Sequence, residues 1–222
     1  MADLGVTLFG KKFKNPVIPG AGPNVRDGAL IAQCAEGGAG ALLCKTISMK
    51  AAPVPRPHMA IYARSSMLNT ELWSELSPET WFEKEYPAAL AVAKKHGLPI
   101  GASMGYTASD LATLGPKVEA MGFDWIECTI HYLEHSFDPV IESMSTLRKA
   151  VKIPIVCKLS PHAGDLGDLA EKVEPYVDGF MCINSLGPGL SIDIEKVEPL
   201  MGSQYGYGWL SGEALRPIAL RA

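Results

Sequence analysis

Short apolar runs rich in β-branched residues alternate along the chain with segments in which apolar residues recur at helical spacing. Strands are predicted over residues 16–22, 41–47, 99–105, 125–131, 154–159 and 179–185. Helices are predicted over residues 27–36, 78–96, 108–121, 138–151, 164–174 and from 212 to the end. Apolar residues occupy both sides of these strands, which is typical of parallel strands covered by helices. The alternation predicts an α/β fold with a parallel sheet, either open and doubly wound or closed into a barrel.

Two features favour the barrel. The first predicted turn, Gly20-Ala21-Gly22-Pro23, breaks the G-x-G-x-x-G pattern of dinucleotide-binding sheets. Polar residues also stand near the carboxyl ends of the predicted strands, and a (β/α)8 TIM barrel gathers these ends on the face that carries its active site. These polar residues are Lys45, Thr46, Ser103, Thr129, His131, Lys158, Asn184 and Ser185. Residues 6–13 are predicted to form a hairpin with a Gly-Lys turn that closes the opposite end.

The number of units is smaller than a complete barrel requires. About six β/α units fit the 222 residues, whereas a TIM barrel has eight units and about 250 residues. We expect one barrel domain over residues 1–222 that is truncated before strands seven and eight, which a longer polypeptide or a second chain would supply. Without them, the first and sixth strands would be unpaired apolar edges, which are prone to aggregation.

Charge and cysteine content exclude several classes of protein. The net charge is −4 and there is no block of lysine or arginine, so nucleic acid and anionic membranes are not expected partners. The start of the chain lacks the pattern of a secretory signal, and no apolar run approaches the roughly 18 residues of a membrane span, so a cytoplasmic protein is expected. Five cysteines without C-x-x-C spacing argue against a disulfide framework, a zinc knuckle or an iron–sulfur cluster.

Two lysines lie within apolar strands, Lys45 in Leu-Leu-Cys-Lys-Thr and Lys158 in Ile-Val-Cys-Lys-Leu. A buried lysine without a partner would cost several kcal/mol, so each must face something negative or electron-rich. One interpretation is a bound ligand, and with Asn184 the two lysines would suit an anionic or carbonyl-rich planar cofactor. The other is a core carboxylate such as Glu127 or Asp124.

The stretch from His131 to His135 matches the H-x-x-E-H zinc pattern. That pattern requires both histidines on one face of a helix, but here it spans a predicted strand end and the following turn. A metal is therefore not expected. His131 alone could serve in acid–base chemistry or ligand contact, or it could be a structural residue.

A proline-rich loop over residues 53–57 precedes Asn69-Thr70-Glu71-Leu72-Trp73. Long loops over the mouth of a barrel commonly line or cover its site. Glu71 and Trp73 could equally be surface contacts.

Taken together, these motifs resemble the flavin-dependent dihydroorotate dehydrogenases of the soluble class and the pyrimidine-reducing domain of dihydropyrimidine dehydrogenase. The resemblance covers nearly the whole chain. It is carried by residues 15–22, 41–46, 69–72, 155–161, 183–185 and 208–221.

The resemblance implies FMN over the carboxyl mouth of a TIM barrel, with hydride exchange between flavin N5 and an activated C–C or C=C bond of a small cyclic or carbonyl-containing substrate. By the same resemblance, the substrate would contact Asn69, Glu71, Asn184 and Ser185. The implied cofactor residues are Ala21, Gly22, Lys45, Thr46, Thr129, Lys158, Ile183, Gly208, Ser211 and Gly212.

The fourth predicted strand departs from the family pattern Glu-Leu-Asn-Leu-Ser-Cys-Pro. Thr129 stands where the family has the asparagine that touches flavin and substrate, and Tyr132 where it has the cysteine that carries the proton. Tyr132 or His131 is therefore the expected proton carrier, and a substrate other than the standard pyrimidines is expected.

Two alternatives to a flavin enzyme remain. A metal-dependent hydrolase or lyase could use His131, Glu134 and His135, or the chain could be a non-catalytic barrel subunit of a larger complex. The expected partners are a small-molecule substrate, further copies in a homo-oligomer and an electron-transfer protein.

Overall fold

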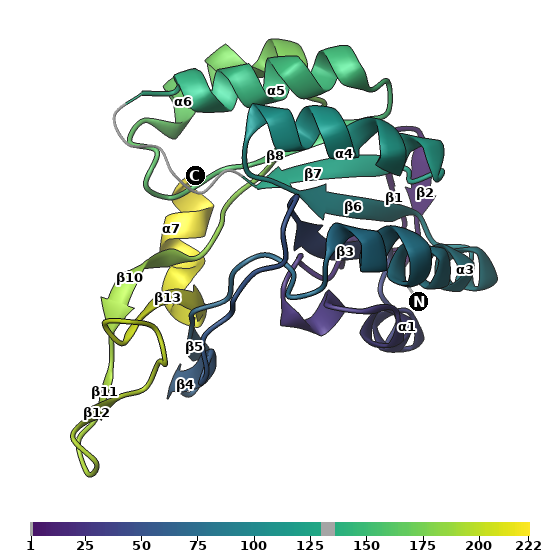
Figure 1. Cartoon of the computed structure of the whole chain (residues 1–222). Helices are drawn as coiled ribbons and strands as arrows, with labels where there is room; N and C mark the ends of the chain where they lie inside the picture. Colours follow the sequence, from purple (N-terminus) through teal and green to yellow (C-terminus); the bar gives the residue numbers. More distant parts are fainter. Residues whose placement is uncertain (1, 130–135) are drawn as a thin grey trace.

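The computed structural model describes residues 2–129 and 136–222. Its centre is a curved five-stranded parallel sheet in the order β3-β6-β7-β8-β9 (Figure 1). The strands are β3 (Leu42–Ile47), β6 (Ile100–Met104), β7 (Trp125–Thr129), β8 (Ile155–Lys158) and β9 (Gly179–Met181). Each lies inside a predicted strand, and all pairings are parallel. The predicted α/β class is thus confirmed, and the sheet forms part of a TIM barrel.

The first predicted strand, residues 16–22, is wrong, because this segment has no strand pairing. Pro16 and Pro19 lack the amide hydrogen that a sheet ladder needs. Val17 is held by two bonds outside any strand ladder: its carbonyl accepts from the Gly40 amide at 2.8 Å, and its amide donates to Asn15 Oδ1 at 3.0 Å. Beyond Pro19 the chain turns, with the Gly22 amide donating to the Gly20 carbonyl.

Helices cover the outer side of the sheet (Figure 1). They are α1 (Gly28–Glu36), α2 (Pro78–Thr80), α3 (Tyr86–His96), α4 (Ala108–Ala120), α5 (Asp138–Ala150) and α6 (Leu166–Val173). A π-helical turn, η2 (Trp81–Glu85), joins α2 to α3, and short 3₁₀ turns form η1 (Pro23–Val25) and η3 (Glu174–Tyr176). None of the helices in the described ranges has the length and apolar character needed to cross a membrane.

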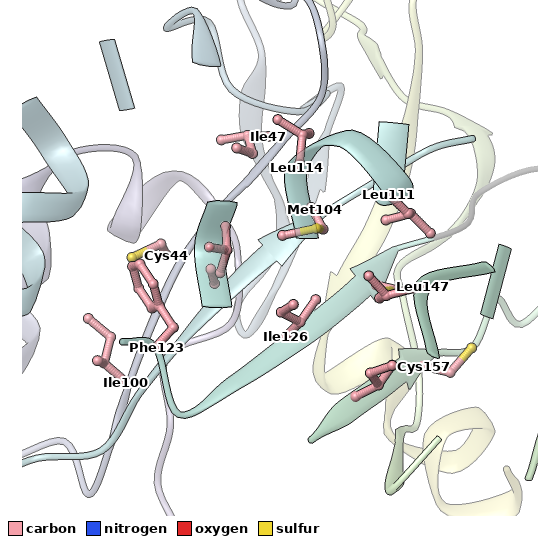
Figure 2. Close-up of a cluster of buried hydrophobic side chains, with 14 of the residues drawn as sticks. Cys44, Ile47, Ile100, Met104, Leu111, Leu114, Phe123, Ile126, Leu147 and Cys157 are labelled. Atoms are coloured by element: carbon pink, nitrogen blue, oxygen red, sulfur yellow. The ribbon is translucent and has the colours of Figure 1, made fainter. Parts of the chain in front are cut away.

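The main core lies between the sheet and these helices. Figure 2 shows side chains from β3, β6 and β7 meeting Leu111 and Leu114 of α4 and Leu147 of α5. Because side chains alternate across a strand, Cys44 and Ile126 enter this core, whereas Leu43 and Trp125 point to the inner side of the sheet.

The predicted hairpin at the amino-terminal ends of the strands is confirmed. Strands β1 (Val6–Leu8) and β2 (Lys11–Phe13) pair antiparallel, and Phe13 packs against Trp125 at a centroid distance of 5.9 Å. The turn residues are Phe9 and Gly10, both at positive φ, and not the predicted Gly-Lys pair. This matches the backbone of a tight two-residue hairpin.

A second, antiparallel sheet projects from the carboxyl ends of the barrel strands (Figure 1). Its order is β10-β13-β5-β4, with a separate ribbon β11-β12. The strands are β4 (Met59–Ala63), β5 (Ser66–Asn69), β10 (Leu186–Leu190), β11 (Ile192–Asp193), β12 (Glu198–Pro199) and β13 (Tyr207–Gly212). The helix predicted from Gly212 begins later, as η4 (Glu213–Leu215) followed by α7 (Arg216–Arg221).

Candidate active site

A cavity of about 360 Å³ lies at the carboxyl ends of the barrel strands, beneath the second sheet. It brings together most of the residues that the sequence predicted for a cofactor and its substrate. Those lining it are Ala21, Gly22, Lys45, Thr46, Asn69, Glu71, Thr129, Lys158, Ile183, Asn184, Ser185 and Ser211. Segments far apart in the sequence therefore form one surface.

Four predicted site residues are not in this lining. Gly208 lies within β13, where a Cβ would meet the Asn69 carbonyl and Met201 at 3.0 Å. Gly212 ends β13 at a φ of +89°. The two candidate proton carriers, His131 and Tyr132, lie outside the described residues, as do Glu134 and His135 of the H-x-x-E-H stretch. Elsewhere in the chain, residues 2–129 and 136–222 hold no group of three or more metal-ligating side chains.

The strand register explains why the two lysines meet. Thr129 of β7 pairs with Lys158 of β8, so both side chains lie on the inner face at the same height. The register between β3 and β6 shifts after Cys44. Lys45 and Thr46 are consecutive in β3, and both line the cavity. Strand irregularities beside active sites commonly redirect side chains in this way.

Lys45 is ion-paired, but with neither of the carboxylates considered from sequence. Its Nζ lies 2.6 Å from Glu71 Oε2, while Glu71 Oε1 lies 3.2 Å from His58 Nε2. Asp124 instead pairs with Lys11 at 2.8 Å, at the far end of the barrel. Burial lowers the pKa of Lys45, an effect that its hydrogen bond to Glu71 opposes and the charge of Lys158 strengthens.

Lys158 differs from Lys45. Within the part of the chain that the structure describes, it makes no hydrogen bond or ion pair, and Glu127 is the carboxylate that interacts with it electrostatically. The Thr129 hydroxyl beside it is buried and finds no hydrogen-bond partner among the described residues. Buried polar atoms are rarely left unsatisfied. A cation that makes no hydrogen bond and an unsatisfied hydroxyl, side by side on one cavity wall, indicate a ligand with electronegative atoms.

Glu127 lies one layer deeper on the inner face. Its Oε1 accepts from Ser103 Oγ at 3.2 Å, and Ser103 Oγ is 2.8 Å from Thr46 Oγ1. This chain of hydrogen bonds links the barrel interior to the cavity. Burial raises the pKa of Glu127, although Lys158 and the Ser103 hydrogen bond partly offset the increase.

Replacing Glu127 with glutamine should therefore remove a pH-dependent loss of stability. A carboxyl whose pKa is raised by folding favours the folded state fully below its ordinary pKa, and this contribution is lost as the pH rises through the raised value. The free energy of unfolding of Glu127→Gln should exceed that of the wild type by an amount that grows as the pH rises above the ordinary pKa of a glutamate, because the wild type alone loses this contribution. Urea denaturation measures this, with the exposed Glu36→Gln as the control. A difference that is constant with pH would contradict it.

Asn69 links two neighbouring strands of the second sheet, β5 and β13, at the cavity rim. Its Nδ2 donates to the Trp209 carbonyl at 3.1 Å and to Ser211 Oγ at 3.3 Å, and its Oδ1 accepts from the Glu71 amide at 3.2 Å. It therefore positions Glu71 as well as lining the site.

Sequence reasoning missed several lining residues: Gly20, Pro23, Asn24, Met59, Met67, Leu72, Tyr106 and Leu215. It also missed His58. The β4–β5 hairpin brings His58 beside Glu71, and the Thr70 amide donates to the His58 carbonyl at 2.8 Å. The apolar run of residues 59–63, followed by the polar residues 64–66, could have signalled this hairpin.

Comparison with known proteins assigns the chain to a family. No family model matches the chain. Dihydroorotate dehydrogenase A (fumarate) of Lactobacillus helveticus is 30% identical over 241 residues, which cover 100% of this chain and 75% of that protein. The catalytic subunit of dihydroorotate dehydrogenase B (NAD(+)) of Thermoplasma volcanium is 29% identical over 232 residues, covering 100% of this chain and 74% of the relative.

A solved structure supports the fold. The Eimeria tenella dihydroorotate dehydrogenase, crystallised with ferulenol, superposes with a TM-score of 0.73 at 15% identity, over 97% of this chain and 67% of that one. The chain belongs to the dihydroorotate dehydrogenase family. The prediction of an oxidoreductase of the class that acts on CH–CH groups is thereby confirmed.

Proposed function

We propose that the chain is an FMN-dependent oxidoreductase whose cavity holds the isoalloxazine ring. The observation that carries this proposal is the cavity wall formed by Lys158 and Thr129. Among the described residues, Lys158 makes no hydrogen bond or ion pair, and the buried Thr129 hydroxyl has no hydrogen-bond partner. A flavin ring presents carbonyl oxygens and ring nitrogens that would satisfy both. The family membership supports the same cofactor.

The residues present fit such a ring. Gly20, Ala21 and Gly22, which have small side chains or none, also line the cavity, and a Cβ at Gly20 would meet nothing within 4 Å. When bound, FMN would exchange a hydride at N5 with a CH–CH or C=C unit. Lys158 would stabilise the negative charge that develops on the ring, and Lys45 would do so more weakly because Glu71 neutralises it.

We infer that the substrate is a small cyclic molecule with amide or carbonyl groups. Asn184 and Ser185 line the same cavity as Glu71 and Asn69, and these side chains offer both donors and acceptors. The relatives are named for dihydroorotate. Thr129 in place of the family asparagine supports a related substrate rather than the standard pyrimidines.

The test is anaerobic incubation of the FMN-loaded protein with dihydroorotate and, separately, with dihydrouracil or other cyclic ureides. Loss of flavin absorbance on addition of one of these supports the function. A protein that binds FMN but stays oxidised with all of them would contradict the proposed chemistry.

Replacing Tyr132 with phenylalanine is expected to slow substrate-driven flavin reduction by about 10²-fold, because a general acid or base contributes roughly 10² to 10⁴. FMN affinity should not change. Stopped-flow absorbance gives the rate, and flavin titration gives the affinity. An unchanged rate would reassign the proton step to His131 or to a group of the described site.

We also propose that two further β/α units complete this barrel domain in the active protein. The outer edges of β3 and β9 are unpaired among the described residues. The inner face beside β9 carries an apolar cavity of about 250 Å³ lined by residues such as Phe9, Trp125 and Phe180. Apolar edges of this kind are normally paired or covered.

A further inference from the structure

One face of the second sheet forms the roof of the cavity of about 360 Å³. Met67 and Asn69 of β5 line the cavity, while Leu68 between them is buried and faces the other way. Met59 of β4 pairs with Asn69, and Ser211 of β13 pairs with Met67. Because residues directly opposite each other share a face of a sheet, the strand register fixes which side chains the roof presents.

The roof has a polar part and an apolar part. Asn69 Nδ2 donates to Ser211 Oγ at 3.3 Å, and these two groups form the polar part. Met59 and Met67 are each 37% exposed, and Leu215, which follows β13, lines the cavity with them. Exposed apolar side chains gathered in one place commonly mark a ligand groove, and methionine adapts well to irregular ligands. The proposed function leaves these three apolar side chains without a role.

The cations of the cavity are already engaged. Among the described residues that line it, the cationic side chains are Lys45 and Lys158. Lys45 Nζ lies 2.6 Å from Glu71 Oε2, and Lys158 is the cation that the proposed function places against the flavin ring. A substrate carboxylate would therefore meet the charge of Glu71 in this lining and find no unengaged cation. Burying a carboxylate without a partner is costly, so the site favours an uncharged substrate.

We propose that the cavity selects an uncharged cyclic amide that carries an apolar substituent, with the substituent seated against Met59, Met67 and Leu215. The proposal rests on the proposed function and deepens it, because it names the class of ring that the same site accepts. Asn69 and Glu71 bind the amide edge of the ring, and the apolar part of the roof covers the substituent. A carboxylated ring such as dihydroorotate is disfavoured.

Isothermal titration calorimetry of the FMN-loaded protein tests the selection with uracil, 5-propyluracil, 6-propyluracil and orotate. These oxidised rings do not reduce oxidised flavin, so the dissociation constants report on binding alone. One of the propyl compounds should bind about tenfold more tightly than uracil or better, because one methylene in an apolar pocket is worth about tenfold or more. Orotate should bind about tenfold more weakly than uracil or worse, because its carboxylate is unpaired. Propyl compounds that bind no better than uracil would overturn the apolar subsite, and orotate that binds as tightly as uracil would overturn the selection by charge.

Serine variants of the two methionines locate the subsite. Met59→Ser and Met67→Ser should each lower the ratio of propyl-compound affinity to uracil affinity by about threefold or more, because each removes apolar surface from the roof. The ratio is the readout, so a general loss of binding does not imitate the effect. Met49→Ser is the matched control, since Met49 is 42% exposed but does not line the cavity. A ratio that stays at the wild-type value in both cavity variants would overturn the assignment.

The outcomes separate this proposal from the proposed function. If none of the corresponding dihydro compounds reduces the flavin, the proposed function fails, while the affinity ratios still decide the subsite. If the protein retains no FMN, the same titrations on the flavin-free protein decide it. The competing occupant of the roof is a second copy of the chain. Sedimentation velocity that shows a dimer dissociated by Met67→Ser, together with unchanged affinity ratios, would assign the methionines to that contact and overturn the proposal.

Discussion

Replacing Lys158 with methionine is expected to slow substrate-driven flavin reduction by about 10² to 10³-fold. Methionine keeps the length and apolar stem of the side chain but removes the cation that faces the cavity. Removing one group that stabilises developing charge in a site shielded from water typically costs about 2.7 to 4 kcal/mol of barrier. The effect should be larger than for Lys45→Met, because Glu71 already neutralises Lys45.

Stopped-flow absorbance would measure the rate, and the midpoint potential of the bound flavin would show the cause. The potential should become more negative in Lys158→Met, since the anionic reduced ring loses its counter-charge. The matched control is Lys172→Met, which removes a lysine paired with Asp168 on the outer helix α6. Equal rates and potentials in Lys158→Met and the wild type would show that this lysine does not face the ring.

Replacing Gly101 with alanine is expected to destabilise the fold by about 1 to 3 kcal/mol, the usual cost of overpacking a core. A Cβ at Gly101 would lie 2.1 Å from Cε2 of Trp125, whose indole fills the inner layer at the base of the sheet. Phe13 also packs against that indole, with ring centroids 5.9 Å apart, which limits how far the indole can shift.

Urea denaturation would measure the loss as a lower transition midpoint. Gly20→Ala is the control, because a Cβ there meets nothing within 4 Å. Adding Trp125→Leu to Gly101→Ala should recover part of the lost stability, since the two changes act on one contact. A Gly101→Ala protein as stable as the wild type would contradict the packing of this layer.

The barrel strands could be predicted because their signal is local. Apolar β-branched runs such as 42–47 and 155–158 are typical of buried parallel strands, and their order along the chain fixes their order in the sheet. The segment 16–22 has the same apolar character but fails for a local reason, its two prolines. The second sheet was missed because its pairing is non-local, as in Trp209 opposite Asn69.

The same distinction between local and non-local signals applies to the candidate site. Lys45, Thr129 and Lys158 were predictable because a barrel gathers the carboxyl ends of its strands. The partner of Lys45 was not, because Glu71 reaches it from a loop that is tied to β3 by the Ser74 amide and the Thr46 carbonyl. His58 was missed for a similar reason, since its contact with Glu71 depends on the hairpin that brings the two residues together.

Equilibrium dialysis against FMN and, separately, against lumiflavin tests the central claim most directly. Lumiflavin carries the ring without the phosphate, so its retention reports on the cavity of Lys158 and Thr129 alone. We expect the wild type to retain both compounds at one ring per chain and Lys158→Met to retain less of each. A wild-type protein that retains neither would contradict the assignment of this cavity to a flavin ring.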